Sequence, residues 1–304
     1  MNAFWEGVMP AMTTAFTADD KLDLNTMNRN LQAQLAAGVS GIILGGTLGE
    51  ASTLSEEEKG ILIRNTLEVV QGRVPVVCNI AEQSTAMAIK AAQQAENFGA
   101  QGLMLLPPMR YKATEQEVLD YMVAVAAATS LPIMIYNNPV DYRIEVTLDM
   151  FEELLEHDNI QAVKESTRDI SNIHRIKNRF GERLRILCGV DTLALESILM
   201  GAHGWVAGLV CAFPEETVAI YSLAREGRIR EALELYRWFM PLLELDLSPQ
   251  LVQNIKLASV ATGLGTEYVR LPRMPLQGPD RERVQALIDE RMKIRPVLPE
   301  YSRV

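Results

Sequence analysis

Eight short apolar runs, separated by longer helical patterns, constrain the fold of this chain more than any other feature. The runs that predict strands cover residues 7–13, 41–45, 74–79, 102–106, 132–136, 160–164, 185–188 and 204–206. Several of them are apolar on both sides of the pleat, as expected for buried parallel strands. Because a helical pattern follows each run, the sequence predicts repeated βα units and a parallel sheet.

The helical patterns carry recognisable start signals. Ser55 is followed three residues later by Glu58, and Thr114 by Glu117. This spacing predicts a capping box, in which each side chain of the pair accepts a hydrogen bond from a free backbone N–H group at the start of the helix. Ser84 is also a predicted N-cap residue. These signals place helices directly after the second, third and fourth runs.

The number of βα units favours a closed barrel. Eight units over about 220 residues match the size of a (β/α)₈ barrel. An open, doubly wound sheet is the alternative, but it would carry a glycine-rich phosphate-binding turn after the first strand. Here the first run leads instead into Thr13-Thr14-Ala15-Phe16.

The alternation stops near residue 228. Residues 230–245, 249–263 and 280–293 have helical patterns with Pro and Gly between them. We therefore predict a TIM (β/α)₈ barrel over residues 1–227, which holds the active site, and a C-terminal three-helix appendage over residues 228–304.

Composition excludes several classes of function. The net charge of −10 argues against nucleic acid as a partner, because nucleic-acid binding needs a basic surface. No apolar run reaches the roughly 18 residues of a membrane span, and the first residues lack the pattern of a signal peptide. The three cysteines are widely spaced, as is typical of a reducing cytosol, and Cys78 and Cys188 lie in apolar runs that predict buried, inert thiols. We expect a cytoplasmic protein.

No metal site is expected. His157, His174 and His203 are far apart in the sequence and do not have the spacing of metal ligands. Their order with serine and aspartate does not indicate a catalytic triad either. We expect His157 and His174 at the surface.

Lysine chemistry is indicated at the end of the sixth run. In a barrel of this kind the active site lies at the carboxyl ends of the strands, and residues 160–164 end in Lys164. A lysine among apolar residues is partly desolvated, which lowers its pKa and makes the amine available as a nucleophile. An ion pair between Lys164 and Glu165 is the structural alternative.

Two other runs end in polar groups. The fifth ends in Tyr136-Asn137-Asn138-Pro139, where a tyrosine can exchange protons with a substrate, although a hydroxyl satisfied by backbone is the commoner case. The second ends in Gly45-Gly46-Thr47-Leu48-Gly49-Glu50, whose glycines allow backbone N–H groups to form a nest for a carboxylate. A plain tight turn is the alternative there. Nucleotide binding is not expected, because the turn lacks the lysine of a Walker loop.

Three motifs therefore stand at three strand ends. They are Gly46-Thr47-x-Gly49-Glu50, Tyr136-Asn137-x-Pro139 and Val163-Lys164-Glu165-Ser166. Their order and spacing resemble the dihydrodipicolinate synthase/N-acetylneuraminate lyase family, and the resemblance covers essentially the whole chain. It implies a TIM barrel whose strand-six lysine forms a Schiff base with pyruvate or a similar 2-oxo acid.

The resemblance also implies roles for individual residues. Lys164 is the Schiff-base lysine, and Tyr136 relays protons to the substrate. Thr47 and the backbone of Leu48 resemble the carboxylate-binding pair, and Val206 resembles a position whose backbone carbonyl faces the site. No cofactor is implied beyond the covalent lysine Schiff base. The family suggests a homo-oligomer, either a dimer or a tetramer.

Three positions depart from the pattern of the synthases. Leu48 replaces the second threonine of Thr-Thr-Gly-Glu. In the loop after the fourth run, Arg110 aligns with the synthases' relay tyrosine, and Tyr111 lies one residue later. Asp141 stands where synthases carry an arginine that grips the semialdehyde carboxylate, and Arg143 lies two residues further on. The missing relay and the missing clamp argue against lysine biosynthesis.

A closer resemblance is to Δ1-pyrroline-4-hydroxy-2-carboxylate deaminases of hydroxyproline breakdown. The shared segments are Tyr136-Asn137-Asn138-Pro139 with Tyr142-Arg143, Met109-x-Tyr111, and Gly204-Trp205-Val206-x-Gly208 with Ala212-Phe213-Pro214. In that reaction the lysine attacks C2 of the cyclic imine, the 4-hydroxyl leaves, water adds, and ammonia is released with 2,5-dioxopentanoate. We expect Asn138 in the substrate site, and Arg110 or Arg143 to hold a carboxylate or the hydroxyl.

The sequence thus predicts a Schiff-base lyase, with this deamination as its reaction. 4-Hydroxy-tetrahydrodipicolinate synthase or another pyruvate-dependent aldolase is the alternative. A barrel that binds a small acid without catalysis is the alternative of another class, and the presence of both Lys164 and Tyr136 speaks against it.

Overall fold

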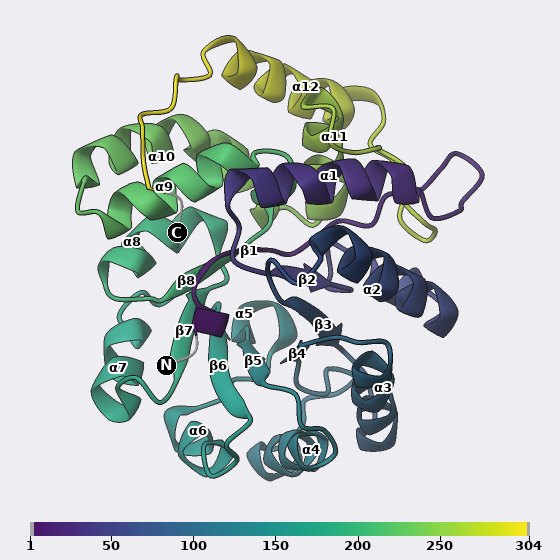
Figure 1. The fold of residues 1–304 in the computed structure, drawn as a ribbon, viewed down its shortest axis with the longest axis vertical. Coiled ribbons are helices and arrows are strands. Elements are labelled where there is room, and N and C mark those ends of the chain that lie inside the picture. The colour runs from purple at the N-terminus through teal and green to yellow at the C-terminus, as the bar shows by residue number, and fades with distance from the viewer. Residues whose placement is uncertain (1–2, 303–304) are drawn as a thin grey trace.

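The computed structural model describes residues 3–302, and eight parallel strands form its centre (Figure 1). The strands are β1 (Gly7–Pro10), β2 (Ile42–Leu44), β3 (Val76–Ile80), β4 (Gly102–Leu105), β5 (Ile133–Asn137), β6 (Ile160–Glu165), β7 (Arg185–Cys188) and β8 (Gly204–Ala207). They pair in the order β1-β8-β7-β6-β5-β4-β3-β2, and a parallel bridge between Ala11 and Ile43 joins β1 to β2. The strands therefore form a closed barrel, which confirms the predicted fold class.

The strands are apolar in sequence because they are buried in the structure. Every residue of β1, β4, β5 and β8 is buried, so both faces of these strands exclude water. One face fills the barrel and the other lies under the surrounding helices, as in other α/β barrels. Each predicted run overlaps one observed strand, with boundaries that differ by three residues or fewer.

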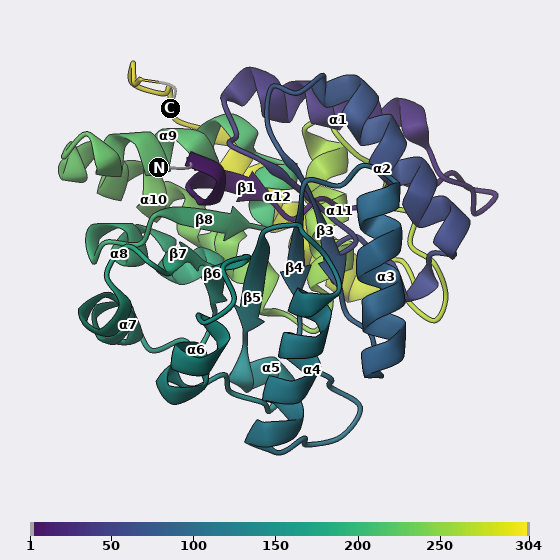
Figure 2. The ribbon, with the colours of Figure 1, turned by 60° about the horizontal axis from the view of Figure 1, so that its bottom comes forward.

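Helices surround the barrel (Figures 1 and 2). They are α1 (Leu24–Ala37), α2 (Glu56–Val70), α3 (Thr85–Asn97), α4 (Glu115–Ala127), α5 (Pro139–Tyr142), α6 (Leu148–Leu154), α7 (Asn172–Phe180), α8 (Ala194–Leu199) and α9 (Pro214–Arg225). The capping boxes predicted at Ser55 and Thr114 are both present, and the Ser84 side chain accepts a hydrogen bond from the N–H of Met87. The predicted starts of α2, α3 and α4 are therefore confirmed.

Three further helices follow the barrel, as predicted. They are α10 (Ile229–Leu243), α11 (Leu251–Ala261) and α12 (Gly278–Lys293), and a short 3₁₀ turn, η5 (Glu244–Leu247), continues α10. Figure 1 shows them beside α1 and α9. The ring of Phe213, at the start of α9, lies 5.4 Å from the ring of Phe239 in α10. The division into domains at residue 228 stays a prediction.

A buried ion pair joins the C-terminal segment to the glycine turn after β2. Lys256 of α11 donates a hydrogen bond to Glu50, and both side chains are almost completely buried. Lys256 also donates to the carbonyl of Tyr268, and Glu50 accepts from the N–H of Arg270 at 3.0 Å. Breaking such a pair leaves one charge buried alone, so the turn and the segment are held together strongly.

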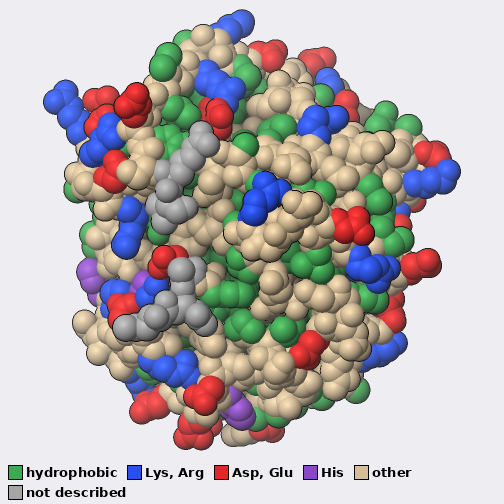
Figure 3. Space-filling model, in the orientation of Figure 1, with side chains coloured by type: hydrophobic (Ala, Val, Ile, Leu, Met, Phe, Trp, Pro, Cys, Tyr) green, Lys and Arg blue, Asp and Glu red, His purple; other side chains and the backbone are tan. Residues whose placement is uncertain are grey.

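The cysteines and the surface fit the expectations from composition. All three cysteines are free and buried, and burial raises the pKa of Cys78 to about 11 and that of Cys188 to about 12. The prediction that these two thiols are buried is confirmed, and the raised pKa values fit the expected lack of reactivity. On the face shown in Figure 3, basic and acidic side chains are interspersed. No helix within residues 3–302 is long and apolar enough to cross a membrane.

Candidate active site

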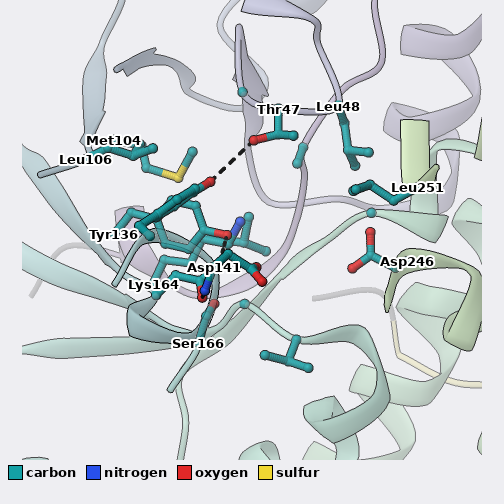
Figure 4. Close-up of a pocket in the computed structure, with 18 of the residues that line it drawn as sticks. Thr47, Leu48, Met104, Leu106, Tyr136, Asp141, Lys164, Ser166, Asp246 and Leu251 are labelled. Carbon is teal, nitrogen blue, oxygen red and sulfur yellow. Dashed lines mark hydrogen bonds between the residues drawn. The ribbon is translucent and has the colours of Figure 1, made fainter. Parts of the chain in front are cut away.

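A cavity of about 220 Å³ lies at the carboxyl ends of the strands (Figure 4). Pockets for drug-sized ligands have volumes of roughly 300–1,000 Å³, so this cavity suits a smaller molecule. Seven of the residues predicted for the site line it: Gly46, Thr47, Leu48, Tyr136, Asn138, Lys164 and Val206. The barrel therefore brings together residues that are up to 160 positions apart in the sequence.

Lys164 is the buried amine of this cavity. It is only 7% exposed, and no described residue forms a hydrogen bond with its Nζ atom. Burial lowers its pKa, although nearby acidic groups oppose the shift. Glu165 accepts hydrogen bonds from the N–H of Thr167 and from Asn172, so the alternative of a Lys164–Glu165 ion pair is wrong.

Sheet register brings the lysine to the tyrosine. Lys164 on β6 is the register partner of Tyr136 on β5. Paired positions on neighbouring parallel strands direct their side chains to the same face, here the barrel interior. As a result, the Lys164 Nζ atom lies 4.0 Å from the centre of the Tyr136 ring. Two of the three residues predicted for catalysis, which also include Thr47, are therefore in contact.

Gly189, directly after β7, makes room for the lysine. A Cβ atom at this position would lie 2.7 Å from Cε of Lys164 and 2.1 Å from Oγ of Ser166. Both distances are too short for a real contact, so a side chain at residue 189 would displace the amine. The Oγ atom of Ser166 is buried without a hydrogen-bond partner in the described chain, and it faces the same cavity. The sequence analysis did not single out Gly189, although a glycine that directly follows a strand run could have signalled it.

Asn138 orients the hydroxyl of Tyr136. Its amide donates hydrogen bonds to the Tyr136 hydroxyl at 3.1 Å and to the carboxylate of Asp141 at 2.8 Å. Its carbonyl oxygen caps α5 by accepting from the N–H of Asp141. Burial raises the pKa of Tyr136 to about 12, so its hydroxyl keeps its proton at neutral pH. That hydroxyl can donate a proton and take it back.

Tyr142 adds a second hydroxyl that the sequence analysis had noted only as part of a motif. Its hydroxyl lies 3.4 Å from Oγ1 of Thr47, the contact dashed in Figure 4, and it also interacts with the hydroxyl of Tyr136. The two tyrosine rings meet edge to face, with centres 5.5 Å apart. Hydroxyl groups therefore run continuously from the glycine turn to Tyr136.

The glycine turn offers free donors. The backbone N–H groups of Thr47 and Leu48 make no hydrogen bond within residues 3–302. Together with the Thr47 hydroxyl they can bind a carboxylate at the cavity wall. This arrangement fits the predicted anion nest.

The arginines expected at the substrate lie elsewhere. Arg110 and Arg143 are exposed and do not line the cavity, and Tyr111 is 54% exposed. Arg168 lines the cavity instead, and its Nη2 atom lies 3.5 Å from Oδ1 of Asp141. Arg168 has a φ of 64°, a left-handed conformation that costs a non-glycine residue roughly 1–2 kcal/mol. The motif search missed Arg168 because it follows Lys164 in a loop without a pattern.

Two aspartates were also missed. Asp191 is completely buried and accepts hydrogen bonds from the indole of Trp205 and from the N–H groups of Gly208 and Leu209, so it fixes the end of β8. Asp246 in η5 lines the cavity. No sequence motif marks Asp246, because it comes from the helical appendage.

The histidines lie away from the cavity. His174 is exposed, and the Nδ1 atom of His203 accepts a hydrogen bond from the N–H of Ile186. In the part of the chain that the structure describes, no three His, Cys, Asp or Glu residues are grouped as metal ligands.

Comparisons with known proteins agree with this geometry. The Dihydrodipicolinate synthetase family matches residues 4–291. The 4-hydroxy-tetrahydrodipicolinate synthase of Exiguobacterium sibiricum is 32% identical over 272 residues, which cover 90% of this chain and 92% of that protein. The synthase structure from Methylacidiphilum fumariolicum has a TM-score of 0.88 and 29% identity, and covers 95% of this chain and 97% of its own.

A pyruvate complex is among the similar structures. Dihydrodipicolinate synthase from Acinetobacter baumannii, solved with pyruvate, has a TM-score of 0.90 and 25% identity, and covers 95% of this chain and 99% of its own. The match therefore includes the strand ends and the C-terminal helices alike. These matches, together with the Lys164 site, show that the chain is an enzyme that belongs to the dihydrodipicolinate synthetase family.

Proposed function

We propose that this family member is a Schiff-base lyase that converts Δ1-pyrroline-4-hydroxy-2-carboxylate and water into 2,5-dioxopentanoate and ammonia. One observation carries the Schiff-base chemistry: the Lys164 amine is buried, unpaired and in contact with Tyr136. The choice of substrate rests on the wall beyond the amine. That wall presents the carboxyl groups of Asp141 and Asp246, and its arginine, Arg168, already faces Asp141.

Each residue of the site has a separate role in the proposed reaction. The turn at Thr47 and Leu48 holds the substrate carboxylate, which places C2 of the cyclic imine over Lys164. The amine attacks C2, and the hydroxyl of Tyr136 donates a proton to the ring nitrogen that leaves C2. The resulting iminium withdraws electrons, which eases loss of a proton from C3. The apolar side chain of Leu48 suits a small ring.

4-Hydroxy-tetrahydrodipicolinate synthase is the second candidate. The relatives named above carry this activity. Arg168 at the cavity could hold the second carboxylate of an aldehyde substrate, and the Tyr142 hydroxyl could serve as the proton relay. Arg168 and Tyr142 would take the places of the arginine and the relay tyrosine that the synthase pattern has and this sequence lacks.

Two assays separate the candidates. The purified protein is incubated with Δ1-pyrroline-4-hydroxy-2-carboxylate and, separately, with pyruvate plus aspartate semialdehyde. We expect ammonia and 2,5-dioxopentanoate from the first incubation and no condensation product in the second. Condensation without ammonia release would replace the first proposal by the second. Absence of both, with Lys164 also unmodified after borohydride reduction with pyruvate, would favour a binding protein.

We further infer a cytoplasmic homo-oligomer. Three free, buried thiols fit a reducing compartment, and the half-exposed Tyr111 stands in a loop that a neighbouring subunit could cover. The fold alone does not fix assembly, because a matching structure is described as a monomeric dihydrodipicolinate synthase variant. Light scattering coupled to size exclusion gives the number of subunits, and a monomer would contradict this inference.

A further inference from the structure

Asp246 is a carboxyl group in the cavity that has no partner within residues 3–302. It belongs to η5, after α10, and lines the cavity beside Leu247 and Leu251. Its side chain is half-buried, and no described residue forms a hydrogen bond or an ion pair with it. Figure 4 shows Asp246 on the side of the cavity opposite Tyr136. Its carboxyl oxygens therefore have no described protein partner at the cavity wall, and a ligand in the cavity can form hydrogen bonds with them.

Gly208, just after β8, leaves the space that this carboxyl group occupies. A Cβ atom at Gly208 would lie 2.8 Å from Oδ1 of Asp246 and 3.1 Å from Cδ1 of Leu48. The φ of Gly208 is −97°, a value open to any residue, so its backbone conformation does not require glycine. A Cβ atom there would instead push the end of the Asp246 side chain out of its present position. The barrel and the helical appendage are therefore matched around one carboxyl group.

The charges around Asp246 favour its acid form. Burial raises its pKa to about 8, and Asp191 and Asp141 act in the same direction, whereas Lys164 and Arg168 oppose them. The shift favours the protonated form of this carboxyl group relative to an ordinary aspartate. Such a group donates one hydrogen bond and accepts another, which is the pattern that complements an alcohol.

We propose that Asp246 binds the hydroxyl group of the substrate and, if the proposed deaminase function holds, protonates that hydroxyl as it leaves. The Thr47 turn binds the substrate carboxylate, and Lys164 binds C2. With these two points fixed, C4 is directed toward the remaining wall of the cavity. That wall is formed by η5 and the start of α11. Asp246 is the acidic group on it.

The elimination balances without a further reactant. The Tyr136 oxygen, which gave its proton to the ring nitrogen, takes a proton from C3. The nitrogen lone pair of the resulting enamine then forms the C2=N bond, and the C2=C3 pair moves to C3=C4. The C4–O bond breaks, and the oxygen takes the proton of Asp246 and leaves as water. The Asp246 carboxylate takes a proton from C5, the Tyr136 hydroxyl returns its proton to C3, and Asp246 passes the C5 proton to C4, which leaves an imine at C5. One water molecule hydrolyses this imine to the aldehyde and ammonia. A second water hydrolyses the C2 iminium, which releases the 2-oxo acid and restores the Lys164 amine.

The binding role is tested without the deaminase reaction. Borohydride trapping on Lys164 is compared by mass spectrometry for 2-oxobutanoate and 4-hydroxy-2-oxobutanoate, which differ only in the hydroxyl. We expect the wild type to trap the hydroxylated acid at about tenfold lower concentration, the ratio typical of one hydrogen bond. Asp246→Ala should trap both acids equally. Glu244→Gln, which removes an exposed carboxyl group of the same turn, should keep the preference.

The acid role has its own readout. Asp246→Asn keeps a hydrogen-bonding group but cannot donate the acid proton, so ammonia release should fall about 100-fold or more in kcat with little change in KM. Equal trapping of both acids by the wild type, or a preference retained in Asp246→Ala, would overturn the binding role. Normal kcat in Asp246→Asn would overturn the acid role. If the wild type releases no ammonia, the deaminase proposal and the acid role both fail, while the trapping preference still decides binding.

Discussion

The strand ends and the C-terminal segment form opposite walls of one cavity, but they fix their residues by different means. Lys164 and Tyr136 are register partners on neighbouring strands, so the hydrogen-bonded barrel determines their contact. Asp246 sits in a 3₁₀ turn between helices and depends on packing and on the Glu50–Lys256 pair. The barrel can therefore keep the lysine chemistry unchanged while the helical wall varies to select substrates.

The first prediction tests the strand wall and has the largest effect. Lys164→Ala should abolish turnover, because no other group in the cavity can form the Schiff base. The fold should persist, since the variant removes a buried amine that makes no hydrogen bond within residues 3–302. Steady-state rates and circular dichroism measure both properties. Turnover above background in a folded variant would remove Lys164 from the mechanism.

Tyr136→Phe should slow turnover by about two to four orders of magnitude, the usual range for lost acid–base help. The ring remains beside the lysine, so borohydride trapping should still label Lys164. Tyr142→Phe is the matched comparison, because its hydroxyl contacts both Thr47 and Tyr136 but is not the proton donor in the proposed mechanism. We expect a smaller loss there. A near-normal rate in Tyr136→Phe would place the proton transfer elsewhere.

Lys256→Met tests the link between the two walls. It leaves the buried Glu50 carboxylate with only the more distant Arg273, 4.0 Å away, as a counter-charge. We therefore expect a loss of about 3 kcal/mol in the free energy of unfolding, at the lower end of the range for a broken buried pair. Replacing both residues, as Glu50→Gln with Lys256→Met, should recover most of that loss. Urea titrations measure the difference. Equal stability of the single and the double variant would mean that the charge pair does not hold the turn.

Much of the strand wall could be predicted from the sequence, and little of the helical wall. A lysine or tyrosine that ends an apolar run is visible because strand direction fixes where its side chain goes. Asp246 has no such marker, since its approach depends on how α10 packs on the barrel. Arg168 was missed for a related reason, because a left-handed loop residue has no periodic pattern. Arg110 and Arg143 were chosen by spacing alone, and the structure places both outside the cavity.

The pH dependence of stability should reveal the shifted pKa of Asp246 in the helical wall. The pKa of Asp246 rises from an ordinary value near 4 in the unfolded chain to about 8 in the folded one, so the folded state binds the extra proton. Stability contributed by this group is therefore present below pH 4 and is lost as the pH rises to 8. Asp246→Asn should raise Tm more at pH 8 than at pH 5, whereas Glu244→Gln should not. An equal change at both pH values would show that the carboxyl group titrates normally.

The smallest expected effect tests whether the two walls are fitted to each other. Gly208→Ala adds a Cβ atom that would lie 2.8 Å from Oδ1 of Asp246. That distance is too short, so the carboxyl group must shift. A displaced contact group weakens its function without removing it, so we expect the preference for a hydroxylated acid to fall a few-fold, less than in Asp246→Ala. In the Asp246→Ala background the same change should have little further effect, because the atom it displaces is gone. An equal loss in both backgrounds would mean that Gly208 acts through Leu48 rather than through Asp246, since residues that share no contact contribute independently.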